Sequence, residues 1–335
     1  MADIVLSVAE AHALVAAAIS ASDTLPETAV SVADALIGAE LAGQGGHGLR
    51  RVPAYAAQAR IGKVKGRARP RLTRARPGAV HIDAGFGFAY PAFELAIAEL
   101  VTIAPAQGIA FAGIFRSHHA GVTGLFVERL AEKGMVALMF ANAPGSMAPW
   151  GARTPLFGTN PIAFAAPVED GPPIVVDVSL SKVARGKIMA ASQKREPIPA
   201  GWAFDAEGKP TTDANAALAG TMVPLGDAKG TALALMVELL AAGLTGGNFA
   251  YEQSSFFDDK GAPPGTGQLI IAIDPGAFGG VRALARFREM AEAIAGADGA
   301  RVPGHRRQEI RARLQRDGIS ADAALIEEIR KIGAR

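Results

Sequence analysis

Short apolar segments that alternate with helical segments constrain the fold of this 335-residue chain more than any other feature of its sequence. Each apolar segment is rich in Ala, Val, Ile and Phe and is bounded by Gly, Pro or polar residues, a pattern typical of buried strands. They occupy residues 79–84, 108–115, 135–142, 161–167, 173–180 and 268–275, and helical patterns lie between several of them, at 93–107, 123–133 and 230–244. The alternation predicts an α/β fold, or an α+β fold built in layers.

The N-terminal part of the chain has the pattern of two helices. Ser7 and Glu10 are expected to form a capping box before a helix at 8–21, and Thr24 with Glu27 has the same spacing before a second helix. A capped amphipathic helix without preceding basic residues differs from a signal peptide, so we expect a cytoplasmic protein.

The C-terminal part returns to helical patterns, which suggests how the chain is divided. Charged helical segments follow residue 280, whereas the apolar strand candidates all lie between the two helical ends. We therefore predict a helical domain formed by residues 1–75 together with 285–335, and an α/β domain formed by residues 76–284.

Composition excludes several classes of site and partner. The chain has no cysteine, which removes disulfides, thiolate nucleophiles and cysteine-ligated metals. The apolar residues are interrupted too often for a membrane span of about 20 residues. Residues 59–78 are basic and free of acidic residues, but they lack the interleaved aromatic residues that stack on bases, so we interpret them as a solvated connection and expect no nucleic-acid partner.

Two histidine segments carry the strongest signals for chemistry. His47 lies in a glycine-rich stretch and is followed by Arg51 and Tyr55; histidine can move a proton near neutral pH and arginine can bind a carboxylate with two hydrogen bonds. His118 and His119 follow an apolar strand and precede a glycine turn, where α/β proteins place functional groups. No acidic residue or further histidine stands at ligand spacing beside this pair, so a metal site is not expected.

Three other polar segments could hold a phosphate-bearing ligand. Residues 158–160 form a turn before Pro161, residues 175–187 lead from a strand with polar residues into a basic helix start, and Lys229 lies at a glycine-rich helix start. The segment 85–90 resembles a dinucleotide fingerprint but has Tyr90 where a small residue is required, so we interpret it as a turn without a ligand.

Taken together, these segments resemble the malate/L-lactate dehydrogenase family over essentially the whole chain. The motifs in family order are HGLRRVPAY, SHHAGVTG, PWGARTPLFGTNPIAF, VVDVSLSKVARGK, IPAGWAFDAEGKPTTD, PLGDAKG and VPGHRR. The segments around residues 148–167 and 179–191 are most similar to the branch that contains (2R)-3-sulfolactate dehydrogenases.

The resemblance implies a fold, a reaction and an assembly. The fold would be the non-Rossmann NAD(P)-binding fold of the sulfolactate dehydrogenase-like type with a small helical domain, usually built as a homodimer. The reaction would be NAD(P)-dependent hydride transfer at carbon 2 of a small 2-hydroxy or 2-oxo acid of the sulfolactate, malate or lactate type. Reduction of a cyclic imine acid (Δ1-piperideine-2-carboxylate or Δ1-pyrroline-2-carboxylate) and an inactive nucleotide-binding paralogue are the alternatives.

The resemblance also assigns roles to residues. His47 would donate the proton, Arg51 would hold the substrate carboxylate and His119 would orient or polarise the reacting group. The remaining substrate-binding residues would be Tyr55, Ser117 and Thr159, and the cofactor would be bound by Gly158, Thr159, Asn160, Val176, Asp177, Val178, Ser179, Leu180, Ser181, Ala228, Lys229, Gly304, His305 and Arg306.

Four motifs depart from the usual family pattern, at five positions. Gly46 replaces a serine, Ala120 replaces a phenylalanine, Ala152 replaces a glycine, and His305 replaces a glutamate; His118 also stands where the family usually has asparagine. The changes at His118 and Ala120 affect the residues that would pack beside His119, and together the changes leave two alternatives open: a weakened or shifted substrate specificity, or a degenerate paralogue.

Overall fold

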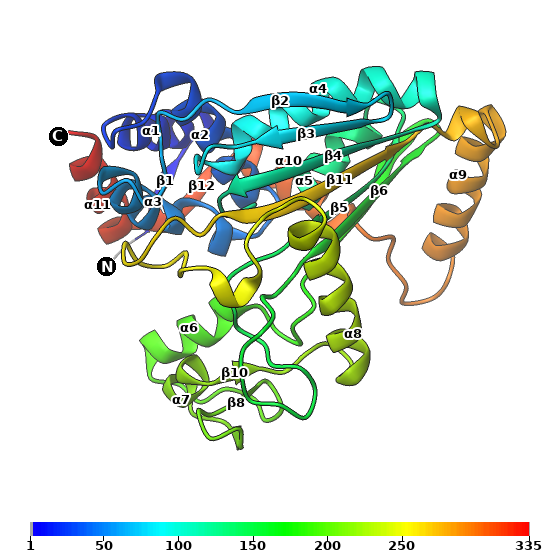
Figure 1. The fold of residues 1–335 in the computed structure, drawn as a ribbon. Coiled ribbons are helices and arrows are strands. Elements are labelled where there is room, and N and C mark those ends of the chain that lie inside the picture. Colours follow the sequence, from blue (N-terminus) through cyan, green and yellow to red (C-terminus); the bar gives the residue numbers. More distant parts are fainter. Residues whose placement is uncertain (1–2, 335) are drawn as a thin grey trace.

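A seven-stranded mixed sheet forms the centre of the computed structural model, which describes residues 3–334 (Figure 1). In spatial order its strands are β2 (Arg71–Arg76), β3 (Ala79–Asp83), β4 (Ile109–Ser117), β11 (Thr266–Ile273), β5 (Val136–Ala141), β6 (Ile162–Val168) and β7 (Gly171–Val178). β3 and β4 are parallel and every other neighbouring pair is antiparallel. All six expected strands are present, and this sheet confirms the mixed α/β class.

The two faces of the sheet pack against different helices because successive side chains of a strand point to opposite faces. In β11, Ile270 and Ala272 join the main apolar core together with residues of α4 (Ala89–Gln107) and α5 (Gly124–Ala131). Leu269 instead joins a second apolar cluster that contains α8 (Ala228–Val237), which continues as a π-helical turn, η3 (Glu238–Gly243).

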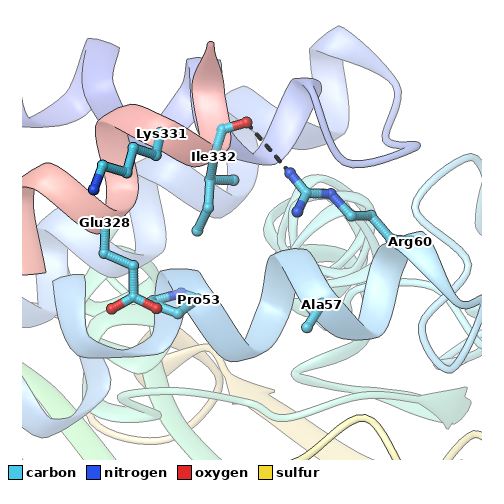
Figure 2. Close-up of a pocket in the computed structure, with 6 residues that line it drawn as sticks. All are labelled: Pro53, Ala57, Arg60, Glu328, Lys331 and Ile332. Carbon is cyan, nitrogen blue, oxygen red and sulfur yellow. Dashed lines mark hydrogen bonds between the residues drawn. The ribbon is translucent and has the colours of Figure 1, made fainter. Parts of the chain in front are cut away.

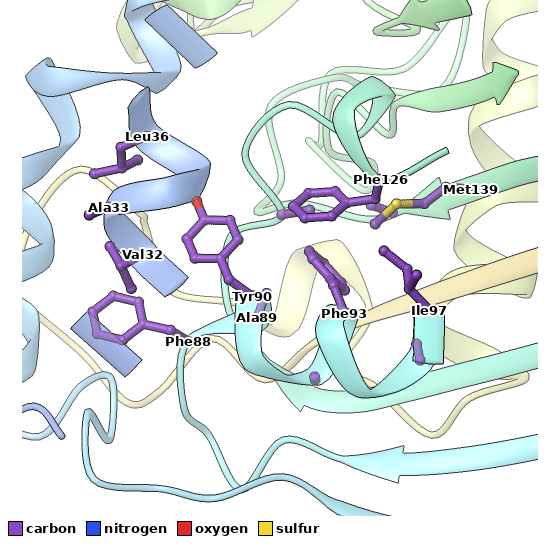
Figure 3. Close-up of a cluster of buried hydrophobic side chains, with 14 of the residues drawn as sticks. Val32, Ala33, Leu36, Phe88, Ala89, Tyr90, Phe93, Ile97, Phe126 and Met139 are labelled. Atoms are coloured by element: carbon purple, nitrogen blue, oxygen red, sulfur yellow. The ribbon is translucent and has the colours of Figure 1, made fainter. Parts of the chain in front are cut away.

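Helix α4 is long and apolar enough to cross a membrane by length and composition alone, but half of that stretch is buried inside the protein. Phe93 and Ile97 face Phe126 of α5 and Met139 of β5, and Tyr90 at the helix start lies close to α2 (Figure 3). The apolar length of α4 is therefore explained by its position in the main core.

The helical layer is formed by both ends of the chain. It contains α1 (Val8–Ser20), α2 (Pro26–Leu41), α3 (Val52–Arg60), α10 (His305–Asp317) and α11 (Ala323–Gly333), with a two-stranded sheet of β1 (Asp3–Leu6) and β12 (Ile319–Asp322). Residues of this layer and of the large sheet belong to one continuous apolar core. Helix α9 (Val281–Ala295) lies apart from the layer, at the opposite end of the molecule beside the sheet (Figure 1).

The start of α2 corrects one prediction. The capping box at Ser7 and Glu10 is present, but Thr24 and Glu27 do not form one, because α2 begins after Leu25 with Pro26 in its first turn. The Thr24 hydroxyl donates to the carbonyl of Ser22 instead. A proline at the first helical position has a suitable φ and needs no N–H partner, which explains the shifted start.

The basic stretch 59–78 also differs from the expected connection. Its first two residues end α3, and Arg71–Arg76 form the exposed edge strand β2. Charged side chains on an edge strand oppose pairing with another chain, so arginines are suitable residues for β2. Their basic composition is the reason why the sequence did not indicate a strand here.

Residues 185–222 form a small layer, of which the sequence predicted only the helix start near residue 185. It contains α6 (Arg185–Lys194), α7 (Ala214–Ala219) and a three-stranded sheet of β8 (Ala203–Phe204), β9 (Pro210–Thr211) and β10 (Thr221–Met222). These strands have two residues each, too few for a period of two to be visible in the sequence. Their buried side chains pack with α8 in the second apolar cluster.

Candidate active site

The segment that carries His47 is a compact turn between α2 and α3. Two short 3₁₀ helices, η1 (Gly45–His47) and η2 (Leu49–Arg51), connect the longer helices. The Glu40 carboxylate accepts the N–H of Leu49 at 2.8 Å, and Arg51 Nε donates to the carbonyl of Gly46 at 2.9 Å. The turn therefore places the imidazole and the guanidinium on one short, internally bonded segment.

His119 comes to His47 from the end of β4. The two rings stack with their centroids 5.1 Å apart and an interplanar angle of 22°. The Tyr55 hydroxyl lies 2.6 Å from His119 Nδ1 and 3.0 Å from the hydroxyl of Tyr90. The two predicted catalytic histidines and the predicted tyrosine thus meet in one site.

The two buried tyrosines indicate which nitrogen of His119 carries a proton. Burial raises the pKa of Tyr55 to about 12 and that of Tyr90 well above its usual value, so both hydroxyls stay protonated. Tyr90 has no other hydrogen-bond partner within residues 3–334, so it satisfies its O–H by donating to Tyr55, which in turn donates to His119 Nδ1. His119 then carries its proton on Nε2, where it can donate to a bound substrate.

His118 has a structural position beside this pair. Its Nε2 lies 2.8 Å from Gln58 Oε1, and its carbonyl accepts hydrogen bonds from Thr266 and Gln268 of β11. The residue is 1% exposed and its ring packs against Phe256. The adjacent residues His118 and His119 therefore have different environments. Within the described residues, no group of three or more possible metal ligands is found.

Burial keeps the histidines of the site neutral. It lowers the pKa of His47 and of His118 to about 3, with a further lowering by Arg51 at both and by Lys63 at His118. The pKa of His119 is lowered well below its usual value, again mainly by burial and then by Arg51. The site therefore presents one guanidinium beside neutral imidazoles, a suitable environment for an anionic ligand.

We expect these histidines to make the protein sensitive to acid. Their pKa values are lower in the folded state than the ordinary value near 6.5, so the unfolded state binds more protons and stability falls as the pH decreases from about 6.5 toward 3. For His118 the loss at pH 5 is about 2 kcal/mol. Urea unfolding at pH 7.5 and pH 5 measures this loss, and His118→Gln should reduce the difference between the two pH values. An unchanged difference in His118→Gln would contradict the assignment.

Sequence reasoning did not identify Phe256 and Phe257, which form another wall of the site. The Phe256 ring lies 4.8 Å from the His119 ring, and the Arg51 guanidinium lies 4.5 Å from the centre of the Phe257 ring. Both residues belong to an irregular segment between η4 (Ala250–Glu252) and β11. Two adjacent phenylalanines in a loop carry no periodicity, so only the structure shows what they contact.

The segments assigned to the cofactor meet beside β7. The N–H of Leu180 donates to the carbonyl of Thr159, and the carbonyl of Leu180 accepts the N–H of Leu225, which precedes Ala228 and Lys229. Within β7 itself, the N–H of Val175 donates to the carbonyl of Pro303, next to Gly304. The structure therefore brings together four segments that are far apart in the sequence.

Donor groups in these segments suit a phosphate-bearing cofactor. Helices α8 and α10 both begin without a side-chain cap among the described residues, at Asp227 and Gly304. Lys229 lies in the first turn of α8, and His305 and Arg306 open α10. Uncapped helix N-termini with basic residues are favourable for phosphate groups. The hydroxyls of Ser179 and Ser181, 3.2 Å apart, add further polar atoms.

Two of the assigned cofactor residues already have internal partners. The Asp177 carboxylate accepts from Thr123, from the N–H of Gly124, from Gln44 and from Arg307, which it pairs at 3.2 Å. Through Gln44 it connects β7 to the turn that carries His47. Its role in the structure is thus to join the cofactor segments to the histidine segment.

Asn160 is fully buried and its side-chain Nδ2 likewise has internal partners, whereas its Oδ1 has no hydrogen-bond partner in the described part of the chain. The Nδ2 donates to Glu238 Oε1 at 2.9 Å and to the carbonyl of Ala234 at 3.0 Å. Glu238 begins the π-helical turn, a feature frequent at functional sites, and also accepts from Asn142. Asn160 therefore fixes the turn 158–160 to α8, and Thr159 is the partly exposed member of that turn.

The departures from family motifs lie in different surroundings. A β-carbon at Gly46 would meet no atom within 4 Å, so packing does not require glycine there. Ala120 is buried beside the histidines, whereas Ala152 is exposed.

Ser117, a predicted substrate-binding residue, is 1% exposed, and its hydroxyl has no hydrogen-bond partner in the described part of the chain.

A pocket on the outer side of α3 contains none of the assigned residues. It has a volume of about 300 Å³ and lies between α3 and α11; its lining residues are Pro53, Ala57, Arg60, Glu328, Lys331 and Ile332 (Figure 2). Arg60 closes one side by donating to the carbonyl of Ile332 at 3.3 Å. Tyr55 and Gln58 project from α3 toward the histidines, so this pocket is separate from the candidate active site.

Comparison with known proteins decides the family. The sequence profile described as malate/L-lactate dehydrogenase matches residues 6–330. The chain belongs to this family. It is 47% identical over 325 residues to a (2R)-3-sulfolactate dehydrogenase (NADP(+)) from Chromohalobacter salexigens, with 97% of each chain covered. The protein is accordingly an oxidoreductase of the malate/L-lactate dehydrogenase family.

Solved structures of the family agree with the fold. A Δ1-piperideine-2-carboxylate reductase from Pseudomonas syringae pvar. tomato superimposes with a TM-score of 0.93 at 38% identity, covering 98% of this chain and 99% of the other. A sulfolactate dehydrogenase from Methanocaldococcus jannaschii superimposes with a TM-score of 0.89 at 27% identity, covering 98% and 96%. The mixed α/β architecture is therefore that of sulfolactate and malate dehydrogenase-like proteins.

Proposed function

We propose that this protein transfers a hydride from NAD(P)H to carbon 2 of a small 2-oxo acid. In the reverse reaction it would transfer a hydride from the 2-hydroxy acid to the oxidised cofactor. The observation that carries the proposal is the meeting of four residues in one site, in which His119, Tyr55 and Arg51 are buried and His47 is half-buried. Such a site has a guanidinium for the carboxylate and two imidazoles for the reacting oxygen. These are the groups that the reaction requires besides a hydride donor.

In the reduction direction, the residues would act in the following order. Arg51 binds the carboxylate with two hydrogen bonds. The Nε2–H of His119, fixed by Tyr55, donates to the oxygen on carbon 2. His47 then gives a proton to this oxygen. The negative charge of the bound carboxylate offsets the positive charge of Arg51, and this raises the pKa of His47 toward the range in which the imidazole is protonated.

The cofactor would be held by the segments beside β7. Ser179, Ser181 and the N-termini of α8 and α10 would bind its phosphates, and reduced nicotinamide supplies the hydride when bound. Use of NADP(+) by the relative with 47% identity favours NADPH here. Lys182, Arg185, Lys194 and Arg195 are the nearby basic residues available for its additional phosphate.

A second candidate function is the reduction of a cyclic imine acid. The neutral state of all three histidines favours it, because an imine that is already protonated needs no general acid and would be stabilised beside neutral imidazoles. The solved reductase at a TM-score of 0.93 provides further support.

We also propose that the protein forms a homodimer in the cytoplasm. Apolar side chains of α8 and η3 are exposed in the single chain, including Leu235 at 47% and Leu239 at 55%. A second copy of the chain would cover such a surface.

The experiment that tests the reaction follows NAD(P)H absorbance with a panel of acids. Purified protein is offered 3-sulfopyruvate, oxaloacetate, pyruvate and Δ1-piperideine-2-carboxylate with each cofactor. We expect turnover with at least one 2-oxo acid; turnover with the imine alone would replace the first proposal by the second. Cofactor binding without turnover of any acid would contradict both and favour an inactive nucleotide-binding protein.

A further inference from the structure

A buried lysine lies just behind the candidate active site. The Lys63 side chain is 0% exposed, and its Nζ lies 2.7 Å from the carbonyl oxygen of Ser255, 2.9 Å from that of Asp258 and 2.5 Å from that of Lys260. The Asp258 carboxylate lies 3.4 Å away. An ammonium has three N–H groups, so these oxygens occupy all of its donors.

All of these oxygens belong to one loop, residues 253–261, which carries the aromatic wall of the site. Phe256 packs on the His119 ring and Phe257 lies against the Arg51 guanidinium. Gln58 adds a second connection, because its Nε2 donates to the Phe256 carbonyl at 2.9 Å while its Oε1 lies 2.8 Å from His118 Nε2. The loop thus contacts both the residue that would polarise the substrate and the residue that would bind its carboxylate.

We propose that Lys63 is a positioning residue that sets the placement of Arg51 and His119 through the loop 253–261. This inference rests on the proposed function. Lys63 cannot bind substrate itself, because its donors are occupied and its side chain is buried. Without its charge, three carbonyls and a carboxylate would converge on an apolar space. Polar groups left without partners in such a space favour opening toward water.

Phe257 is the part of the loop most dependent on this arrangement. Its side chain is 38% exposed, so burial holds it only partly, and its contact with Arg51 covers one face of the guanidinium. A guanidinium confined in this way keeps its N–H edges available for a carboxylate. Movement of the loop would release Arg51 and shift the Phe256 ring from His119. Displacements of about 1 Å can cost about 100-fold in rate.

The test compares Lys63→Met, Phe257→Leu and their combination, with Phe278→Leu as the control. Phe278 is 84% exposed and has no contact with the site. We expect Lys63→Met and Phe257→Leu each to lower kcat/KM by about 10- to 100-fold, chiefly through the KM of the acid, with the KM of the cofactor unchanged. The combination should be little worse than the more damaging single change, because both act through one loop.

A readout independent of turnover separates this inference from the proposed function. Hydrogen exchange of residues 253–261 should increase in Lys63→Met. Lactate binding, measured by calorimetry with the reduced cofactor present so that no hydride transfer occurs, should weaken in both single variants. If the wild-type protein turns over no acid but the variants still show these changes in hydrogen exchange and lactate binding, the proposed function fails and the inference stands.

Two results would overturn the inference. One is multiplicative losses of kcat/KM in the combined variant. The other is unchanged lactate affinity in Phe257→Leu, which also decides the question if Lys63→Met does not fold.

Discussion

Replacing His47 with alanine is expected to lower kcat by about 10²- to 10⁴-fold, the usual cost of losing a general acid. His47 stacks on His119, and its Nδ1 is buried without a hydrogen-bond partner in residues 3–334. A buried nitrogen without a partner is available to a ligand that enters the site. Steady-state kinetics with the preferred acid measure the change, and cofactor affinity should stay the same.

His12 provides the matched control for this substitution. Its Nε2 pairs with Asp34 at 2.9 Å on the helical layer, where neither residue contacts the site. His12→Ala should keep the wild-type kcat. If His47→Ala keeps the wild-type kcat, His47 is not the general acid, and His119 is the remaining candidate.

Replacing Arg51 with methionine is expected to lower kcat/KM by about 10²- to 10³-fold. Truncating one partner of a buried, charge-paired contact costs roughly 2–5 kcal/mol, because the other charge is left without compensation. Arg51 is 9% exposed and would face the substrate carboxylate from inside the site. The loss should appear mainly in the KM of the acid, since binding of the carboxylate is shared by ground state and transition state.

The neighbouring Arg50 is the control for Arg51. It is exposed, one residue away and of the same charge. Arg50→Met should therefore retain most of the wild-type kcat/KM, whereas Arg51→Lys should recover only part of it because an ammonium cannot form the two parallel hydrogen bonds. Equal losses in Arg50→Met and Arg51→Met would indicate long-range attraction of the anion instead of a specific contact.

The strands and the histidine segments were predictable because local patterns specify them. β11 has alternate side chains on two apolar clusters, and the Ser7 capping box is a two-residue signal that the structure retains. The spacing of His47, Arg51 and Tyr55 is close to one and two helical turns, so a single short segment could already place them on one side.

The rest of the site depends on contacts between distant segments. Lys63 meets a loop almost 200 residues later in the chain, and Asp177 meets Arg307 across 130 positions. Neither residue type indicates its partner: a lysine after a helix is usually solvated, and an aspartate at a strand end could equally bind a ribose or an internal arginine. The roles of Asp177 and Asn160 as internal connectors therefore required the fold.

The central claim is that hydride goes to carbon 2 of a small acid. It is tested most directly with a reduced cofactor that carries deuterium at the transferable position of the nicotinamide, using the acid that gives turnover. We predict that proton and deuterium NMR of the product will show one deuterium at carbon 2, in both the wild-type protein and the slow His47→Ala variant. A product without deuterium at carbon 2, despite oxidation of the cofactor, would contradict this account.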